Sequence, residues 1–260
     1  MNILIANDDG IKARGIHELA NALSKIADVY ISAPDSQRSA SGHGITMGRE
    51  IFVKEETFEG AKKAYSVSGT PADCVKLGIE LYRSEGIEMD IVFSGINHGS
   101  NLGTDVLYSG TVSAALEGRI KGLPAVAVSV KSDNPEHFEY AARLAAEVAL
   151  KVYESKEKRY VISINAPNIP ATDVKGVKTA YLGVKLYDEV YEPAGERDGG
   201  RLFIYGGDEI KLEENTLETD VGSIDAGYAT ITPLGLDLTD YKAMDTAAEW
   251  CAELDSKIIF

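Results

Sequence analysis

Residues 2–10 read NILIANDDG: the mostly apolar run from Asn2 to Ala6 ends in the polar turn Asn7-Asp8-Asp9-Gly10. A helical pattern with apolar spacings of three and four follows, at Ile16, Leu19, Ala20, Leu23 and Ile26. A strand, a loop and a helix in this order are the first unit of a parallel α/β sheet. The opening of the chain therefore predicts the α/β class.

The alternation of strand and helix continues to residue 165. Short apolar runs predict further strands at Val29 to Ala33, Asp90 to Phe93, Ala125 to Val130 and Tyr160 to Asn165. Helices are predicted after Thr70-Pro71, after Thr111 as N-cap, and over Glu136 to Tyr153. Parallel strands need crossover connections, so we expect a doubly wound, mostly parallel sheet with helices on both faces.

Two regions depart from this alternation. Residues 49–67 alternate only loosely, and we expect strands or a small hairpin outside the main repeat. Beyond Pro167, extended segments separated by turn clusters such as residues 196–200 predict protruding β-hairpins, and a last strand and helix end the chain. We therefore expect an α/β core over residues 1–165 and an extension over residues 166–260 within the same structural unit.

The composition limits the possible partners and compartments. A formal net charge of -15 over 260 residues repels long nucleic acid, although a bound divalent cation can reverse the field locally for a small anion. Cys74 and Cys251 lie far apart without CxxC spacing, which favours buried free thiols over disulfides or a zinc site. The sequence shows neither a signal-peptide pattern nor an apolar run of membrane-spanning length, so we expect a cytoplasmic protein without a membrane partner.

Polar, glycine-rich loops follow three of the predicted strands, where open parallel sheets bind ligands. Asp8 and Asp9 end the first strand, and adjacent carboxylates repel each other unless a cation compensates. Mg²⁺ and Mn²⁺ prefer carboxylate, amide and hydroxyl oxygens. A simple turn at a helix N-terminus is the alternative interpretation of Asp-Asp-Gly. Loops 38–42 and 94–103 offer more oxygens at neighbouring strand ends and favour the metal.

Ser109-Gly110-Thr111 precedes a predicted helix and is our candidate for phosphate binding, because free N–H groups and the helix dipole attract anions. Simple N-capping is the alternative role, and both can hold together. His98 is a candidate proton donor to a leaving group, and hydrogen bonding to the backbone is its alternative. His43, in the first loop, is a candidate substrate contact. We interpret the lone Trp250 as a packing anchor rather than a base-stacking platform.

Five motifs, in this order and spacing, resemble the survival protein E (SurE) family: NDDG at 7–10, RSASG at 38–42, SGTPADC at 68–74, SGINHGSNLG at 94–103 and YSGTVSAALEG at 108–118. The resemblance covers most of residues 1–130. It implies a Rossmann-like α/β body, a β-hairpin extension and an exchanged C-terminal element that builds dimers and tetramers. It also implies a metal-dependent nucleotidase that acts on nucleoside 5′- or 3′-monophosphates.

The resemblance also supplies a set of site residues. The implied ligands of one divalent ion, Mg²⁺ or Mn²⁺, are Asp8, Asp9, Ser39 and Asn97. Of these, Asp8, Asp9 and Asn97 are the expected catalytic residues. Asn101 joins Ser109, Gly110 and Thr111 in the expected phosphate-binding set.

The expected activity is hydrolysis of a phosphoric monoester, with a metal-activated water attacking in line. Attack by Asp8 or Asp9 is the competing chemistry, disfavoured because the DxDx[TV] pattern is absent. A nucleotide-binding regulatory module without hydrolysis is the alternative function, whereas the missing G-x-G-x-x-G after the first strand argues against an oxidoreductase. Loops 36–48 and 94–110 contain only one aromatic residue, Tyr108, which predicts broad base specificity. The small C-terminal region predicts a homodimer or homotetramer.

Overall fold

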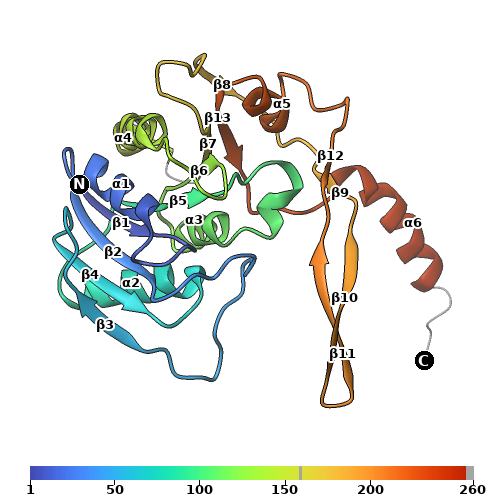
Figure 1. The fold of residues 1–260 in the computed structure, drawn as a ribbon, viewed down its shortest axis with the longest axis horizontal. Coiled ribbons are helices and arrows are strands. Elements are labelled where there is room, and N and C mark those ends of the chain that lie inside the picture. Colours follow the sequence, from blue (N-terminus) through green and yellow to red (C-terminus); the bar gives the residue numbers. More distant parts are fainter. Residues whose placement is uncertain (158–159, 256–260) are drawn as a thin grey trace.

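Nine strands form one central sheet in the order β3-β4-β2-β1-β5-β6-β7-β13-β8 (Figure 1). The computed structural model describes residues 1–157 and 160–255. The strands of this sheet are β1 (Asn2–Ala6), β2 (Asp28–Pro34), β3 (Val53–Glu56), β4 (Lys63–Val67), β5 (Ile91–His98), β6 (Ala125–Lys131), β7 (Val161–Pro167), β8 (Val177–Thr179) and β13 (Ala229–Leu234).

The strand order reverses beside β1. This strand pairs in parallel with β2 on one side and with β5 on the other. The chain then adds β4 outside β2, and β6 and β7 outside β5. The gap between the carboxyl ends of β1 and β5 is therefore the topological switch point of the sheet, where ligands bind in this class of fold. The predicted doubly wound α/β fold is confirmed.

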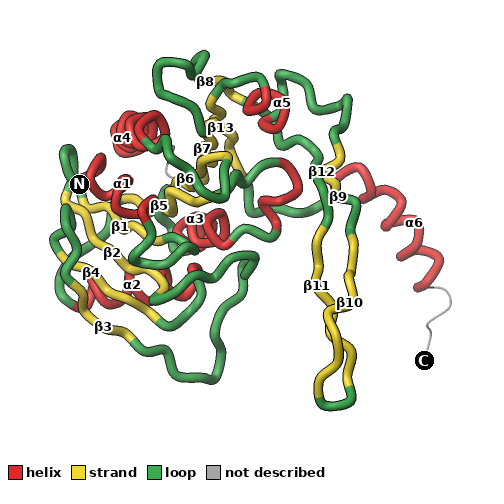
Figure 2. The backbone as a smooth tube through the Cα atoms, viewed as in Figure 1, coloured by secondary structure: helices red, strands yellow, loops and turns green. Residues whose placement is uncertain are grey.

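Helices cover both faces of the sheet (Figures 1 and 2). The helices α1 (Arg14–Leu23) and α4 (Glu139–Glu154) pack on one face, and α2 (Pro71–Ser84) and α3 (Gly110–Ile120) pack on the other. Side chains of β1 alternate between the two layers: Ile3 and Ile5 enter the first core, whereas Leu4 and Ala6 enter the second. Burial on both faces explains why this strand is a continuous apolar run.

The strands predicted within residues 49–67 are present as the antiparallel pair β3 and β4, but the prediction that they lie outside the main repeat is wrong. β4 pairs in parallel with β2, and β3 pairs antiparallel with β4, which makes both part of the central sheet. Ala64 and Val67 are buried in the two cores. The partner of a short strand is chosen by contacts distant in sequence, which loose local alternation does not reveal.

Two predicted boundaries also change. The strand expected to end at Phe93 continues to His98 as β5, through an irregularity in its pairing with β6 between Ser94 and Asn97. Gly95 permits this because its φ is +131°, and a Cβ there would lie 2.2 Å from the Val128 carbonyl oxygen. The N-cap of α3 is Ser109 rather than Thr111, which lies inside the first turn.

The C-terminal region contributes strands to the central sheet and also forms the hairpin extension. β13 pairs antiparallel with β7 and parallel with β8, so residues beyond 165 complete the central sheet. The predicted hairpin is formed by β10 (Val190–Arg197) and β11 (Gly200–Gly206), with β9 (Leu186–Tyr187) and β12 (Glu209–Ile210) paired at its base. Figure 1 shows this hairpin projecting away from the sheet.

Four short or terminal helices complete the described chain: η1 (Gly103–Leu107), α5 (Asp220–Asp225), η2 (Tyr241–Ala243) and α6 (Met244–Asp255). Helix α5 was not predicted from the sequence. Across the described residues, none of the helices combines the length and the apolar character that crossing a membrane requires.

Candidate active site

The acid pair at the end of β1 lies at the switch point. Asp8 is buried, and Thr111 donates its backbone N–H to Asp8 Oδ2 at 3.1 Å and its hydroxyl to Asp8 Oδ1 at 2.5 Å. Asp9 Oδ2 accepts the backbone N–H of His98 at 2.9 Å. The end of β5 and the first turn of α3 therefore hold the two carboxylates in place.

The electrostatics of this pair favour a bound cation. Burial raises the pKa of Asp8 to about 6, and the nearby charge of Asp9 adds to the rise, although hydrogen bonds from Thr111 oppose it. Burial likewise raises the pKa of Asp9, against the hydrogen bond from His98. Throughout residues 1–157 and 160–255, no Lys, Arg or His forms an ion pair with either aspartate. A divalent ion would compensate the two negative charges.

The surrounding donor atoms fit a hard metal ion. Asn7 Oδ1 and Ser41 Oγ are buried without a hydrogen-bond partner. A Cβ placed on Gly110 would lie 2.9 Å from both Ser41 Oγ and Asp8 Oδ2, so this free hydroxyl lies beside the acid pair. Within the described part of the chain, no three His, Cys, Asp or Glu side chains gather as a metal cluster. Two carboxylates supplemented by hydroxyl and amide oxygens suit Mg²⁺ or Mn²⁺ better than zinc.

The loop after β2 approaches the acid pair through its backbone. The Arg38 N–H donates to the Asp8 carbonyl oxygen at 2.7 Å. Ser39, the predicted ligand, is exposed, and its hydroxyl accepts a hydrogen bond from Gln37 at 2.9 Å. Ser41, two residues later, presents a second hydroxyl, which is buried beside Asp8. Sequence reasoning did not single out Ser41, although the RSASG motif contains it.

Asn97 and His98 end β5 beside the acid pair. The Asn97 side chain is 8% exposed and donates from Nδ2 to the Gly99 carbonyl oxygen at 2.8 Å. His98 contacts Asp9 through its backbone N–H, whereas its ring packs 5.5 Å from the Phe138 ring. His98 Nε2 is buried without a partner. His98 therefore contacts the acid pair through its backbone, and its role as a proton donor stays a prediction.

The first turn of α3 lies directly against the acid pair. Ser109 caps the helix by accepting the Val112 N–H at 3.0 Å, and the Thr111 N–H is held by Asp8. The Gly110 N–H has no acceptor among the described hydrogen bonds and sits at the positive end of the helix dipole. Gly110 permits the close approach, because an added Cβ would lie 2.8 Å from the Asp8 Cβ.

Asn101 and His43, both predicted to contact the substrate, form hydrogen bonds with other residues of the protein. Asn101 donates from Nδ2 to Ser129 Oγ at 2.8 Å, and its backbone N–H donates to Asn165 Oδ1 at 2.9 Å, which places it in a buried polar network. His43 Nε2 lies 3.0 Å from Glu117 Oε2 on α3. His43 thus connects its loop to the helix that carries Thr111.

Comparisons with known proteins identify the family of this chain. The model of a family described as Survival protein SurE matches residues 3–189. The 5′-nucleotidase SurE of Syntrophomonas wolfei subsp. wolfei is 42% identical over 247 residues, which cover 94% of this chain and 92% of that protein. The 5′-nucleotidase SurE of Pelotomaculum thermopropionicum is 44% identical over 246 residues, covering 94% of this chain and 93% of that protein.

A solved structure shares the fold. The crystal structure of the SurE protein from Aquifex aeolicus superposes with a TM-score of 0.78 at 36% identity, over 95% of this chain and 98% of that chain. Because these matches span nearly the whole length of the proteins compared, the chain belongs to the survival protein SurE family.

Proposed function

We propose that this protein is a divalent-metal-dependent phosphomonoesterase that hydrolyses nucleoside monophosphates to a nucleoside and phosphate. The observation that carries the proposal is the Asp8–Asp9 pair, which is fixed by the first turn of α3 and the end of β5 and forms no ion pair among the described residues. Two related proteins carry the name 5′-nucleotidase SurE, which supports the same reaction and a small nucleotide substrate.

In this proposal, Asp8, Asp9, Asn97 and Ser39 hold one ion, Mg²⁺ or Mn²⁺, and the buried Ser41 hydroxyl lies beside them. When bound, the ion supplies positive charge to a phosphoryl group and promotes attack by water. Phosphoryl transfer needs mainly charge neutralisation and positioning, which a fixed oxygen-rich site provides.

The protein's own groups perform three tasks. Thr111 holds both oxygens of Asp8, and the His98 N–H fixes Asp9, so neither carboxylate has to reorganise when substrate arrives. The Gly110 N–H and the dipole of α3 attract the phosphate, and the Ser109 cap keeps that helix end open toward the site. Asn101 supports the phosphate set indirectly, by tying the loop after β5 to Ser129 and Asn165.

The test is phosphate release from a panel of nucleoside 5′- and 3′-monophosphates with Mg²⁺, Mn²⁺ or Co²⁺, and with excess chelator. We expect turnover that requires the ion. Tight nucleotide binding without phosphate release under every metal condition would contradict hydrolysis and support the regulatory-module alternative.

Two broader proposals accompany the reaction. The net charge of -15 makes small metal-bound nucleotides better partners than long nucleic acid. We also propose a cytoplasmic location. We also propose a homodimer or homotetramer, because α6 exposes the large apolar side chains of Met244, Trp250 and Leu254.

A further inference from the structure

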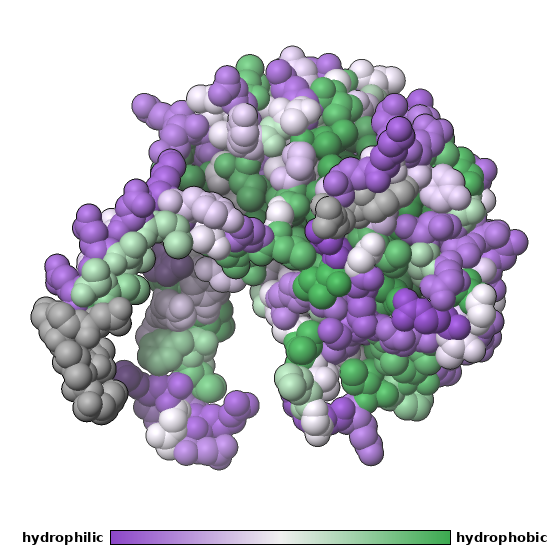
Figure 3. All heavy atoms as spheres, turned by 180° about the vertical axis from the view of Figure 1, so that it is seen from behind, coloured by the Kyte–Doolittle hydropathy of each residue, from purple (hydrophilic) through white to green (hydrophobic). Residues whose placement is uncertain are grey.

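A cavity of about 1010 Å³ lies between the candidate active site and the hairpin extension. Its walls come from the loop after β2, from η1 and the residue that follows it, and from strands β9, β10 and β11 with the turn before β12. Figure 3 shows a deep hollow between the projecting hairpin and the body of the molecule. The cavity lies at the upper end of the range typical of small-molecule sites.

Two segments of the acid-pair site also form walls of this cavity. Ala40 lines it and stands between Ser39 and Ser41 in the chain. Tyr108 also lines it and immediately precedes Ser109, the N-cap of α3. The Gly42 N–H donates to the Tyr108 carbonyl oxygen at 3.1 Å, which holds these two wall segments side by side. The cavity therefore lies next to the candidate phosphate site, on the side formed by Ala40 and Tyr108.

The lining is rich in aromatic faces. Four tyrosines contribute to it: Tyr108, Tyr187, Tyr191 and Tyr205. The Tyr191 and Tyr205 ring centroids are 5.2 Å apart, and Tyr108, Tyr191 and Tyr205 are each more than half exposed. Aromatic faces bind bases by stacking, and they do so with little preference among bases.

The polar groups of the cavity suit a neutral ligand with hydrogen-bond donors. Lys185 Nζ is paired with Asp105 at 2.7 Å and with Glu209 at 3.1 Å, so its charge is already neutralised. The Tyr187 hydroxyl donates to Asp105 at 2.7 Å. Glu189, also in the wall, accepts the Tyr205 hydroxyl on Oε1 at 3.4 Å, and a carboxylate has further lone pairs for ligand hydroxyl or amino groups. A sugar hydroxyl or an exocyclic amine matches this wall, whereas a second phosphate does not.

We propose that this tyrosine-lined cavity binds the nucleoside part of the substrate, with the bases stacking on Tyr108 and Tyr205. The proposal rests on the proposed function, because it assigns the remainder of the same substrate. The loops considered in the sequence contain only Tyr108 as a stacking surface, and the fold adds three tyrosines from the extension. Stacking on them keeps base specificity broad but makes the enzyme prefer nucleotides over phosphate esters without a ring.

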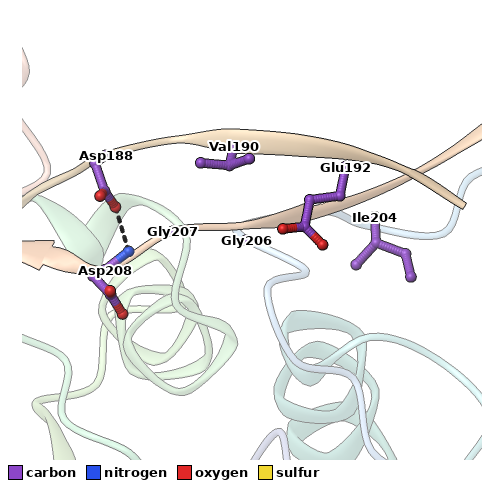
Figure 4. Close-up of a pocket in the computed structure, with 7 residues that line it drawn as sticks. All are labelled: Asp188, Val190, Glu192, Ile204, Gly206, Gly207 and Asp208. Carbon is purple, nitrogen blue, oxygen red and sulfur yellow. Dashed lines mark hydrogen bonds between the residues drawn. The ribbon is translucent and has the colours of Figure 1, made fainter.

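The experiment compares Tyr205→Ala, Tyr205→Phe and Ile204→Ala in the full-length protein. Ile204 is the matched control, since it is the neighbouring residue on β11, is 64% exposed, and lines a different pocket with Val190 and Glu192 (Figure 4). Neighbouring residues of a strand point to opposite faces. The readouts are kcat/KM for adenosine 5′-monophosphate and for glycerol 3-phosphate, and equilibrium binding of adenosine alone.

Tyr205→Ala should lower the kcat/KM for adenosine 5′-monophosphate, relative to that for glycerol 3-phosphate, by roughly tenfold. It should weaken adenosine binding by a similar factor. Tyr205→Phe and Ile204→Ala should keep both near wild type, because the first retains the ring and the second leaves the cavity intact. If Tyr205→Ala lowers both kcat/KM values equally and leaves adenosine binding unchanged, the cavity assignment is overturned while the phosphatase function stands. If no phosphate ester is hydrolysed, the proposed function fails, and adenosine binding still decides the cavity.

Discussion

At the scale of single residues, the site depends on a few side chains with fixed partners. Asp8 and Asp9 carry adjacent charges that backbone N–H groups and one threonine hold, with no ion pair among the described residues. Such an arrangement is unfavourable without a cation, because burial raises the pKa of Asp8 to about 6. The metal-free protein should therefore gain stability when a suitable ion binds.

The first prediction concerns Asp9→Asn, which removes a charge and keeps the shape of the side chain. Mg²⁺ or Mn²⁺ should raise the unfolding temperature of the wild type, and should not raise it for this variant. Phosphate release should fall by several orders of magnitude. Asp28→Asn is the control, since Asp28 is exposed and pairs only with Lys62. Full activity of the wild type in excess chelator would refute the metal assignment.

The second prediction concerns Gly110→Ala. Alanine is the better helix former, but its Cβ would lie 2.8 Å from the Asp8 Cβ and 2.9 Å from Ser41 Oγ. Displacing either group by a few tenths of an ångström should lower kcat by roughly 100-fold, because catalysis depends on close positioning. Gly235→Ala is the matched control, with its nearest atom at 3.9 Å. Equal activities of the two variants in a phosphate-release assay would contradict the placement of Gly110.

At the scale of elements, the loop between β2 and β3 is tied to α2 and α3 (Figure 2). Thr46 donates its hydroxyl to Asp73 at 2.6 Å, and His43 contacts Glu117. Glu117 is 2% exposed and also accepts from Lys76 at 3.0 Å. Burial by itself raises the pKa of Glu117, but the hydrogen bonds from His43 and Lys76 outweigh it and lower the pKa.

The third prediction follows from this lowered pKa. A carboxyl group whose pKa is lowered by folding stabilises the folded state at pH values above its ordinary pKa of 4.5. This stabilisation is lost as the pH falls through the pKa of the folded state. Lys76→Met should therefore cost about 1–3 kcal/mol of unfolding free energy at pH 7. The cost should shrink below pH 4.5.

Lys121→Met is the control, because Lys121 pairs with the exposed Glu80. This substitution should lower the unfolding free energy by less than about 1 kcal/mol. Urea unfolding at pH 7 and at pH 3 measures both variants. A Lys76→Met cost that is the same at the two pH values would show that Glu117 does not depend on this lysine.

At the scale of the whole molecule, the terminal helix α6 exposes apolar side chains instead of packing them into a core. Helix α6 lies apart from the sheet in Figure 1, and its Trp250 is 63% exposed. Cys251 is exposed as well, so the sequence-based expectation of a buried thiol is wrong for this cysteine and right for Cys74. Exposed apolar side chains of this kind indicate a surface that another subunit covers.

The fourth prediction uses Trp250, the only tryptophan of the chain, as a reporter. Light scattering at micromolar concentration should give a mass that is a two- or fourfold multiple of 28.0 kDa. The Trp250 emission should shift to longer wavelength on dilution, because dissociation exposes the ring to water. A stable monomer whose emission does not change with concentration would refute the assembly.

The sequence by itself determined the class of fold and the place of the acid pair. The signals for this were local: periodic apolar runs, Thr70 and Pro71 at the start of α2, and two carboxylates after the first strand. The structure confirms each of them. Local signals are readable because strand and helix periodicity and end-capping depend on residues a few positions apart.

Only the tertiary structure decided which groups meet across long separations in the chain. Three features connect residues more than thirty positions apart: the pairing of β4 with β2, the hydrogen bonds from Thr111 to Asp8, and the cavity that joins Tyr108 to Tyr205. The continuation of β5 to His98 depends on its partner strand β6. The lining of that cavity could not be read from the loops, because three of its four tyrosines lie on strands of the extension. Such contacts arise when packing of the whole chain brings surfaces together, and the local pattern around each residue does not encode its distant partner.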